Sequence, residues 1–124
     1  MIELRNINKS YPLPRHGRKE ILRNASITFR PGVNMGILGL NGQGKSTLIR
    51  CINRLDTPTD GQILIDGENI LALRGKELIR MRRRVSMIFQ QFNLLMQKTV
   101  ARNVRYPLEI AGVSKAQANA RVME

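Results

Sequence analysis

Alternation of apolar and polar positions predicts β-structure in the N-terminal part of the chain. Between Ala25 and Phe29 every second residue is apolar, and the residues between them carry hydroxyl groups. This period of two is that of a half-buried strand. Residues 1–7 predict another strand, and the intervening stretch 11–20 contains two prolines and a glycine, which favours a loop or hairpin. We therefore expect an N-terminal antiparallel β subdomain.

Two short runs without alternation predict strands of a different kind. Residues 33–39 (VNMGILG) and residues 85–89 (VSMIF) are mostly apolar, as are strands that lie inside a parallel sheet with both faces covered. Apolar residues recur at helical spacing across residues 46–55, and residues 76–84 predict a basic helix. Residues 62–70 predict a strand that runs into an Asp-Gly turn. Strands interleaved with helices predict the α/β class.

Two capping signals predict helices in the C-terminal part. Thr99 precedes a periodic apolar stretch and is a favourable N-cap residue. Ser114 is followed three residues later by Gln117, which is the capping-box pattern. The helix that this box announces reaches Glu124 without a terminating glycine or proline. This pattern indicates a chain that halts within a helix, and a frayed natural terminus is the alternative.

Length and composition favour a single domain, residues 1–124, of a globular protein. The hydrophobic fraction of 42% is ordinary for this class. No apolar run reaches the roughly 18 residues of a membrane span, and the N-terminus lacks a signal-peptide pattern. Cys51 is the single cysteine, which excludes an internal disulfide and fits a reducing compartment. We expect a protein of the cytoplasm.

The charge balance is unusual, because 21 Lys and Arg residues face only 9 Asp and Glu residues and give a net charge of +12. A basic surface for nucleic acid or anionic lipid is one interpretation. An acidic portion of the protein outside this sequence is the other, and we favour it because the basic residues are spread along the chain. Only residues 80–84 are dense in arginine, and no aromatic residue interrupts them as a base-stacking surface requires. We expect no nucleic-acid partner.

The most specific motif is GLNGQGKST, residues 39–47, which fits the Walker A pattern. Its glycines allow backbone conformations in which successive N–H groups face phosphate oxygens, and the helix that follows adds the positive end of its dipole. Lys45 is expected to reach the β- and γ-phosphates, and the Ser46 hydroxyl to hold Mg²⁺. The motif predicts a nucleotide with Mg²⁺ and does not by itself choose among GTPases, kinases and transport ATPases. The assignment of ATP follows from a family resemblance that further residues carry. The predicted nucleotide-binding residues of this motif are Gly39, Leu40, Asn41, Gly42, Gln43, Gly44, Lys45, Ser46 and Thr47.

Together with Tyr11, residues 58–70 (PTDGQILIDGENI) and residues 89–95 (FQQFNLL), this motif makes the chain resemble the N-terminal half of an ABC-transporter ATPase subunit. The resemblance implies an incomplete P-loop NTPase core. It matches Tyr11 to the aromatic residue that stacks on adenine, with a tyrosine packed on its own hairpin as the alternative. It matches Gln90 to the Q-loop glutamine that contacts Mg²⁺ and the attacking water. Gln91 is the competing position, and a solvated glutamine pair is the alternative.

Other parts of that family's catalytic site have no match in the chain. The resemblance implies a Walker B Asp followed by a catalytic Glu after an apolar run, an LSGGQ signature and a switch histidine. Asp66 ends an apolar run, but it precedes the Q-loop and is followed by glycine. His16, the only histidine, lies in the early basic loop and is expected to be solvated. We expect the chain alone to hydrolyse ATP no faster than background, and the unpaired strand at 33–39 to favour aggregation or pairing.

The resemblance also suggests cargo and partners. Residues 51–124 resemble the ATPase subunits of methionine-type amino-acid importers, whereas residues 1–50 resemble those of capsular-polysaccharide exporters. It implies a position at the cytoplasmic face of the membrane, a permease subunit that docks near residues 90–100, and a second ATPase subunit in a head-to-tail dimer. A non-hydrolysing ATP–Mg²⁺ binding module is the alternative. The candidate permease contacts are Phe92, Leu94, Leu95 and Met96, and core packing is the favoured interpretation for at least half of them.

Overall fold

The structure, a computed structural model, describes residues 1–123. The chain forms two compact units, Met1–Met87 and the part from Ile88 onward. None of the helices formed by residues 1–123 combines the length and the apolar character that a membrane span requires. The elements of the first unit are β1 (Ile2–Pro12), β2 (Arg18–Phe29), α1 (Lys45–Ile52), β3 (Asp60–Ile65), β4 (Glu68–Asn69) and α2 (Gly75–Arg84). Those of the second are α3 (Val100–Ile110) and α4 (Lys115–Met123).

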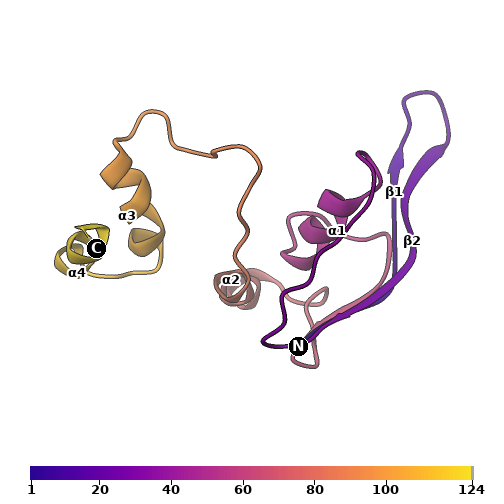
Figure 1. Ribbon diagram of the computed structural model, residues 1–124, viewed down its shortest axis with the longest axis horizontal. Coiled ribbons are helices and arrows are strands. Elements are labelled where there is room, and N and C mark those ends of the chain that lie inside the picture. Colours follow the sequence, from indigo (N-terminus) through magenta and orange to yellow (C-terminus); the bar gives the residue numbers. More distant parts are fainter. Residues whose placement is uncertain (124) are drawn as a thin grey trace. The chain divides into compact units, whose positions relative to one another are not determined.

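The first unit is built on a four-stranded antiparallel sheet in the order β2-β1-β3-β4. β1 and β2 form the long ribbon visible in Figure 1, and Leu13 N donates to Gly17 O (3.1 Å) across the hairpin turn that joins them. The exposure of β2 alternates from Ala25 to Phe29 as the sequence predicts. The predicted N-terminal antiparallel subdomain is therefore confirmed, and its first strand is longer than residues 1–7.

A bulge in β1 explains why two residues of unlike parity are both buried. Side chains of a regular strand alternate, so residues three apart face opposite sides. Leu4 and Ile7 are nevertheless both buried, because the register shifts between them and Asn6 adopts a φ of 51°. Gly61 of β3 lies against the bulge with a φ of 104°, and a Cβ there would stand 2.5 Å from the Asn6 carbonyl oxygen. Only glycine fits this close approach.

Helix α1 packs its apolar stripe on the core of the sheet. Leu48, Cys51 and Ile52 are buried and recur at spacings of three and four, so they lie on one face of the helix. Burying a side chain of this size stabilises a fold by about 1.5–3 kcal/mol. The buried core of the unit comprises Leu4, Ile7, Leu22, Leu48, Cys51, Ile52, Ile63, Ile65, Ile70, Leu73 and Met81. This core fixes the helix that begins at the Walker A lysine.

The second unit confirms both capping predictions. The Thr99 hydroxyl accepts a hydrogen bond from the Arg102 N–H (3.3 Å) at the start of α3. At the start of α4, the Ser114 hydroxyl accepts from the Gln117 N–H (3.4 Å) and donates to the Gln117 side-chain oxygen (2.9 Å). The bonds that the Thr99 and Ser114 hydroxyls accept satisfy helix N–H groups that have no intrahelical acceptor.

The two predicted buried strands, residues 33–39 and residues 85–89, are wrong. Neither range forms a strand, and Leu38 and Ile88 are 96% and 99% exposed. A strand is stable only when its N–H and C=O groups find a neighbouring strand. Within residues 1–123 the four strands pair with one another in the antiparallel sheet, and none pairs with these runs. Apolar composition without a ladder partner leaves both runs irregular.

Candidate functional site

The Walker A segment forms a loop that turns directly into helix α1. Gly44 is the N-cap residue of α1, with φ 87° and ψ 1°, which is the left-handed region that glycine adopts without a steric penalty. A Cβ on Gly44 would lie 2.9 Å from Leu22 Cδ2 and 3.0 Å from the Ile21 carbonyl oxygen. The loop therefore packs against β2 at a point where no side chain fits. This contact sets where the loop ends and the helix begins.

Lys45, the first residue of α1, folds its side chain back over the loop. Its ammonium group donates to the carbonyl oxygens of Gly39 and Leu40, at 2.7 Å each. Within residues 1–123 no carboxylate forms an ion pair with it. A cation held only by two neutral carbonyls retains its capacity to attract an anion.

Backbone donors of the loop and of the helix start lie beside this cation. The first intrahelical bond of α1 runs from Leu48 N to Gly44 O (2.8 Å), so the N–H groups before Leu48 have no acceptor within the helix. Two amides of the loop already have acceptors, because Leu40 N donates to the Gln43 side-chain oxygen (3.0 Å) and Gln43 N donates to the Leu40 carbonyl oxygen (3.4 Å). Ser46 is exposed and Thr47 is half-buried. The arrangement suits an anion at the helix N-terminus.

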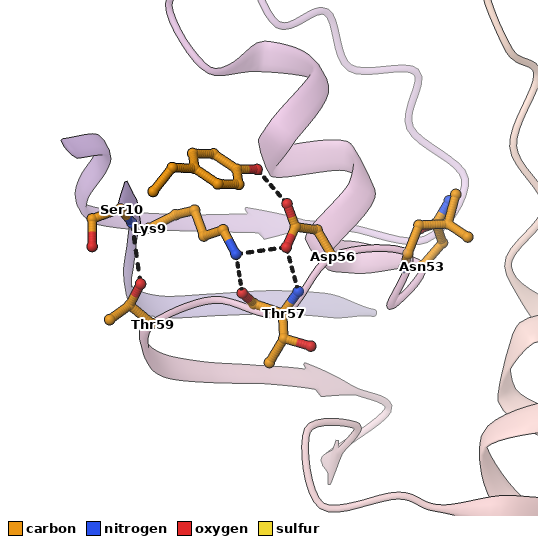
Figure 2. Close-up of polar contacts among 8 residues, drawn as sticks. Lys9, Ser10, Asn53, Asp56, Thr57 and Thr59 are labelled. Carbon is orange, nitrogen blue, oxygen red and sulfur yellow. Dashed lines mark hydrogen bonds and ion pairs between the residues drawn. The ribbon is translucent and has the colours of Figure 1, made fainter. Parts of the chain in front are cut away.

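Tyr11, near the end of β1, is held by a carboxylate from the loop after α1. Its hydroxyl donates to the Asp56 carboxylate, and the Lys9 ammonium donates to Asp56 Oδ1 (2.6 Å) and to the Thr57 carbonyl oxygen (2.6 Å). The same ammonium lies 4.7 Å from the centroid of the Tyr11 ring. Figure 2 shows Asp56 between Lys9 and Thr57, whose N–H donates to Asp56 Oδ1 (2.8 Å).

The charges of this cluster shift the acidities of its members in consistent directions. Burial opposes ionisation of Asp56, but the hydrogen bonds from Lys9 and Tyr11 outweigh it, so the pKa of Asp56 lies below its ordinary 3.8. The hydrogen bond to Asp56 and, after it, desolvation raise the pKa of Tyr11, while the Thr47 hydroxyl acts in the opposite direction. The carboxylate is therefore charged and the phenol neutral at neutral pH.

Sequence reasoning did not find Lys9 or Asp56. Tyr11 and Asp56 are separated by 45 positions, and a single aspartate before a Thr-Pro turn has the appearance of turn chemistry. Lys9 and Tyr11 lie beyond the predicted strand 1–7, and only the observed extension of β1 to Pro12 places them two residues apart on one face of the sheet. The carboxylate that joins them comes from elsewhere in the chain and could be located only by folding.

The Walker A residues and Tyr11 all belong to the first unit. Gln90 and Gln91 belong to the second unit, where both are exposed in an irregular segment, so the role matched to Gln90 stays a prediction. His16 is exposed in the β1–β2 turn, as expected. The four candidate permease contacts of the second unit, Phe92, Leu94, Leu95 and Met96, are all exposed. Core packing of these four side chains is therefore wrong for the part of the chain that the structure describes.

Comparison with known proteins decides the family. The sequence pattern that describes ABC transporters matches residues 22–124, which is most of the chain. The chain belongs to the ABC transporter family. This ABC transporter chain is 46% identical over 123 residues to the methionine import ATP-binding protein of Corynebacterium efficiens, which covers 99% of the chain and 34% of that relative. It is 49% identical over 127 residues to the protein of the same name from Staphylococcus haemolyticus, covering 100% of the chain and 36% of the relative.

Two solved structures of dimeric ABC cassettes share its fold. One, a post-hydrolysis state bound to ADP and Pi, is 32% identical with a TM-score of 0.89 over 99% of this chain and 54% of its own. The other, a bacterial ABC transporter cassette, is 34% identical with a TM-score of 0.88 over 98% and 53%. The predicted class, a partial α/β P-loop NTPase core with an N-terminal antiparallel β subdomain, is confirmed. The ABC transporter chain spans about a third of the length of the curated relatives it matches.

Proposed function

We propose that this chain is the ATP-binding part of an ABC-transporter ATPase subunit that powers import of a methionine-type amino acid. One observation carries the nucleotide assignment: the Lys45 ammonium is held by two backbone carbonyls at the start of α1, where the N–H groups before Leu48 have no acceptor within the helix. The cation, these N–H groups and the positive end of the helix dipole together favour the binding of a phosphate. The cargo assignment is supported by the names of relatives that match 98–100% of the chain.

The residues present fit ATP with Mg²⁺. At Gly44, where the loop ends, there is no room for a side chain, so only backbone groups line this part of the loop. Lys45 supplies one positive charge to a triphosphate. The exposed Ser46 hydroxyl at the helix start is the expected magnesium ligand. The magnesium contact that the resemblance implies for Gln90 stays a prediction. When bound, Mg²⁺ supplies charge neutralisation to the β- and γ-phosphates. The protein residues bind and orient; they add no covalent step.

Turnover requires more than this chain provides. The family places a catalytic Glu after an Asp at the end of an apolar run, and the 124 residues contain no such Asp-Glu pair. We therefore propose that the chain alone holds ATP without hydrolysing it. ATPase activity and transport belong to the longer protein, paired with a second ATPase subunit and a membrane permease at the cytoplasmic face. The exporter interpretation of residues 1–50 stays a prediction, and the importer alignments include those residues as well.

Equilibrium titration with a non-hydrolysable ATP analogue, with and without Mg²⁺, tests the proposal. We expect magnesium-dependent binding that Lys45→Ala weakens at least about tenfold, since a charge-assisted contact to phosphate is lost. Lys76→Ala is the matched control, because Lys76 is an exposed lysine in the first turn of α2. The proposal is wrong if the unaltered chain does not bind the analogue or if Lys45→Ala binds it equally well. Duplex DNA binding that weakens steeply with salt would instead favour a nucleic-acid binder.

A further inference from the structure

The ring of Tyr11 is held at two points by residues that the family resemblance did not assign. Asp56 accepts the hydrogen bond from its hydroxyl, and Lys9 stands over the ring at 4.7 Å. We propose that Asp56 and Lys9 are positioning residues that fix the Tyr11 ring with one face free for the adenine base of the nucleotide. This inference rests on the proposed function, since it names how the base of ATP is received at the same site.

The hydroxyl contact restricts the rotation of the ring. A tyrosine side chain has two rotatable torsions, and an anchored hydroxyl fixes both when the anchor itself is fixed. Asp56 is fixed on several sides: it accepts from Lys9 and from Thr57 N, and its own N–H donates to Arg50 O in α1 (3.0 Å). The last of these contacts ties the carboxylate to the helix that begins at the phosphate cradle. Helix α1 is therefore attached both to Asp56, which anchors Tyr11, and to the Walker A loop.

Lys9 determines which face of the ring remains available. Its ammonium donates to Asp56 Oδ1 and to Thr57 O, both at 2.6 Å, and its side chain is only 12% exposed. It therefore stays over one face of Tyr11 and occupies it through a cation–π contact. Tyr11 itself remains 38% exposed. A flat base can stack only on the face opposite Lys9, and a ring already held in place loses little conformational freedom when the base arrives.

The test compares two magnesium-bound ligands that share a phosphate chain and differ in the base: ATP and inorganic tripolyphosphate, titrated into the 124-residue chain. In Asp56→Asn we expect ATP affinity to fall about fivefold, while tripolyphosphate affinity stays within about twofold, because only the base contact is disturbed. Glu3→Gln is the matched control, a carboxylate-to-amide change that breaks the ion pair of Glu3 with Arg5 on β1, the strand that carries Tyr11. It should alter neither affinity.

A second variant keeps the test decisive if Asp56→Asn folds poorly. Tyr11→Phe keeps the ring and removes the hydroxyl, so it should lower ATP affinity by the same factor and spare tripolyphosphate. The loss in the double variant should be smaller than the sum of the two single losses, because both variants disturb the contact between the Tyr11 hydroxyl and the Asp56 carboxylate. An unchanged ratio of ATP to tripolyphosphate affinity in both single variants overturns the inference, as do additive losses. Failure of the unaltered chain to bind either ligand overturns the proposed function instead.

Discussion

Replacing Gly44 by alanine challenges the loop-to-helix junction at its tightest point. Two costs follow from the structure. At φ 87° an alanine pays about 1–2 kcal/mol that glycine does not. The added Cβ also falls 2.9 Å from Leu22 Cδ2 and 3.0 Å from the Ile21 carbonyl oxygen, and overpacking of this kind costs about 1–3 kcal/mol. The side-chain end of Leu22 can move aside, but the Ile21 carbonyl is part of the β2 backbone and moves only with the strand.

Gly42→Ala separates these two costs. Gly42 has a φ of 79°, and a Cβ there would meet no atom within 4 Å. It therefore bears the backbone penalty alone, and Gly44→Ala should be less stable than Gly42→Ala by the packing term of about 1–3 kcal/mol. With a urea slope of about 1.5 kcal/mol per molar, the two unfolding midpoints should differ by about 0.7–2 M.

Urea unfolding followed by circular dichroism measures both midpoints, and analogue binding is recorded on each folded variant. Equal midpoints for Gly44→Ala and Gly42→Ala would refute the reasoning, because the contact with Ile21 would then carry no cost. A Gly44→Ala variant that is less stable yet binds the ATP analogue normally would show that the junction serves the fold and not the cradle.

Two further outcomes follow from the ionisable groups. The pKa of Asp56 is lowered in the folded state, so the free energy of unfolding that its carboxylate contributes is complete above its unfolded value near 3.8 and is lost as pH falls through the folded value. The difference in stability between the unaltered chain and Asp56→Asn, measured by urea unfolding, should thus shrink below about pH 4. Cys51 is fully buried, and burial raises the pKa of its thiol to about 11. Iodoacetamide should alkylate it slowly in the native chain at pH 8 and rapidly in urea, as mass spectrometry would record.

The patterns that predicted structure correctly are those whose partners lie close in sequence. Alternation located the C-terminal part of β2, residues 25–29, but not its start at Arg18. The Asp-Gly turn located the β3–β4 connection, and Thr99 and Ser114 located the starts of two helices, because each signal concerns neighbouring residues. The Walker A motif likewise placed Lys45 at a helix start. These features depend on local geometry and need no knowledge of the remaining chain.

The features that failed or were missed depend on distant partners. Residues 33–39 have the composition of a buried strand, but a strand exists only with a neighbour, and the composition of one run does not show whether that neighbour is present. The Asp56 contact with Tyr11 joins residues 45 positions apart and could be identified only after β1 and the end of α1 had been placed side by side. The Asn6 bulge, which puts Leu4 and Ile7 on one side, is hidden for the same reason.

The position of β1 between its two neighbours has a kinetic consequence. β2 follows β1 through a short turn. The other neighbour, β3, is distant in the sequence, because its Ile65 pairs with Ile2 of β1. Closing so long a segment costs chain entropy before any contact repays it, and such non-local pairings slow folding. Helix α1, with its 8 residues, lies inside that segment and is too short to persist by itself. The Walker A loop and helix α1 should therefore reach their native structure only when the sheet closes, late in refolding.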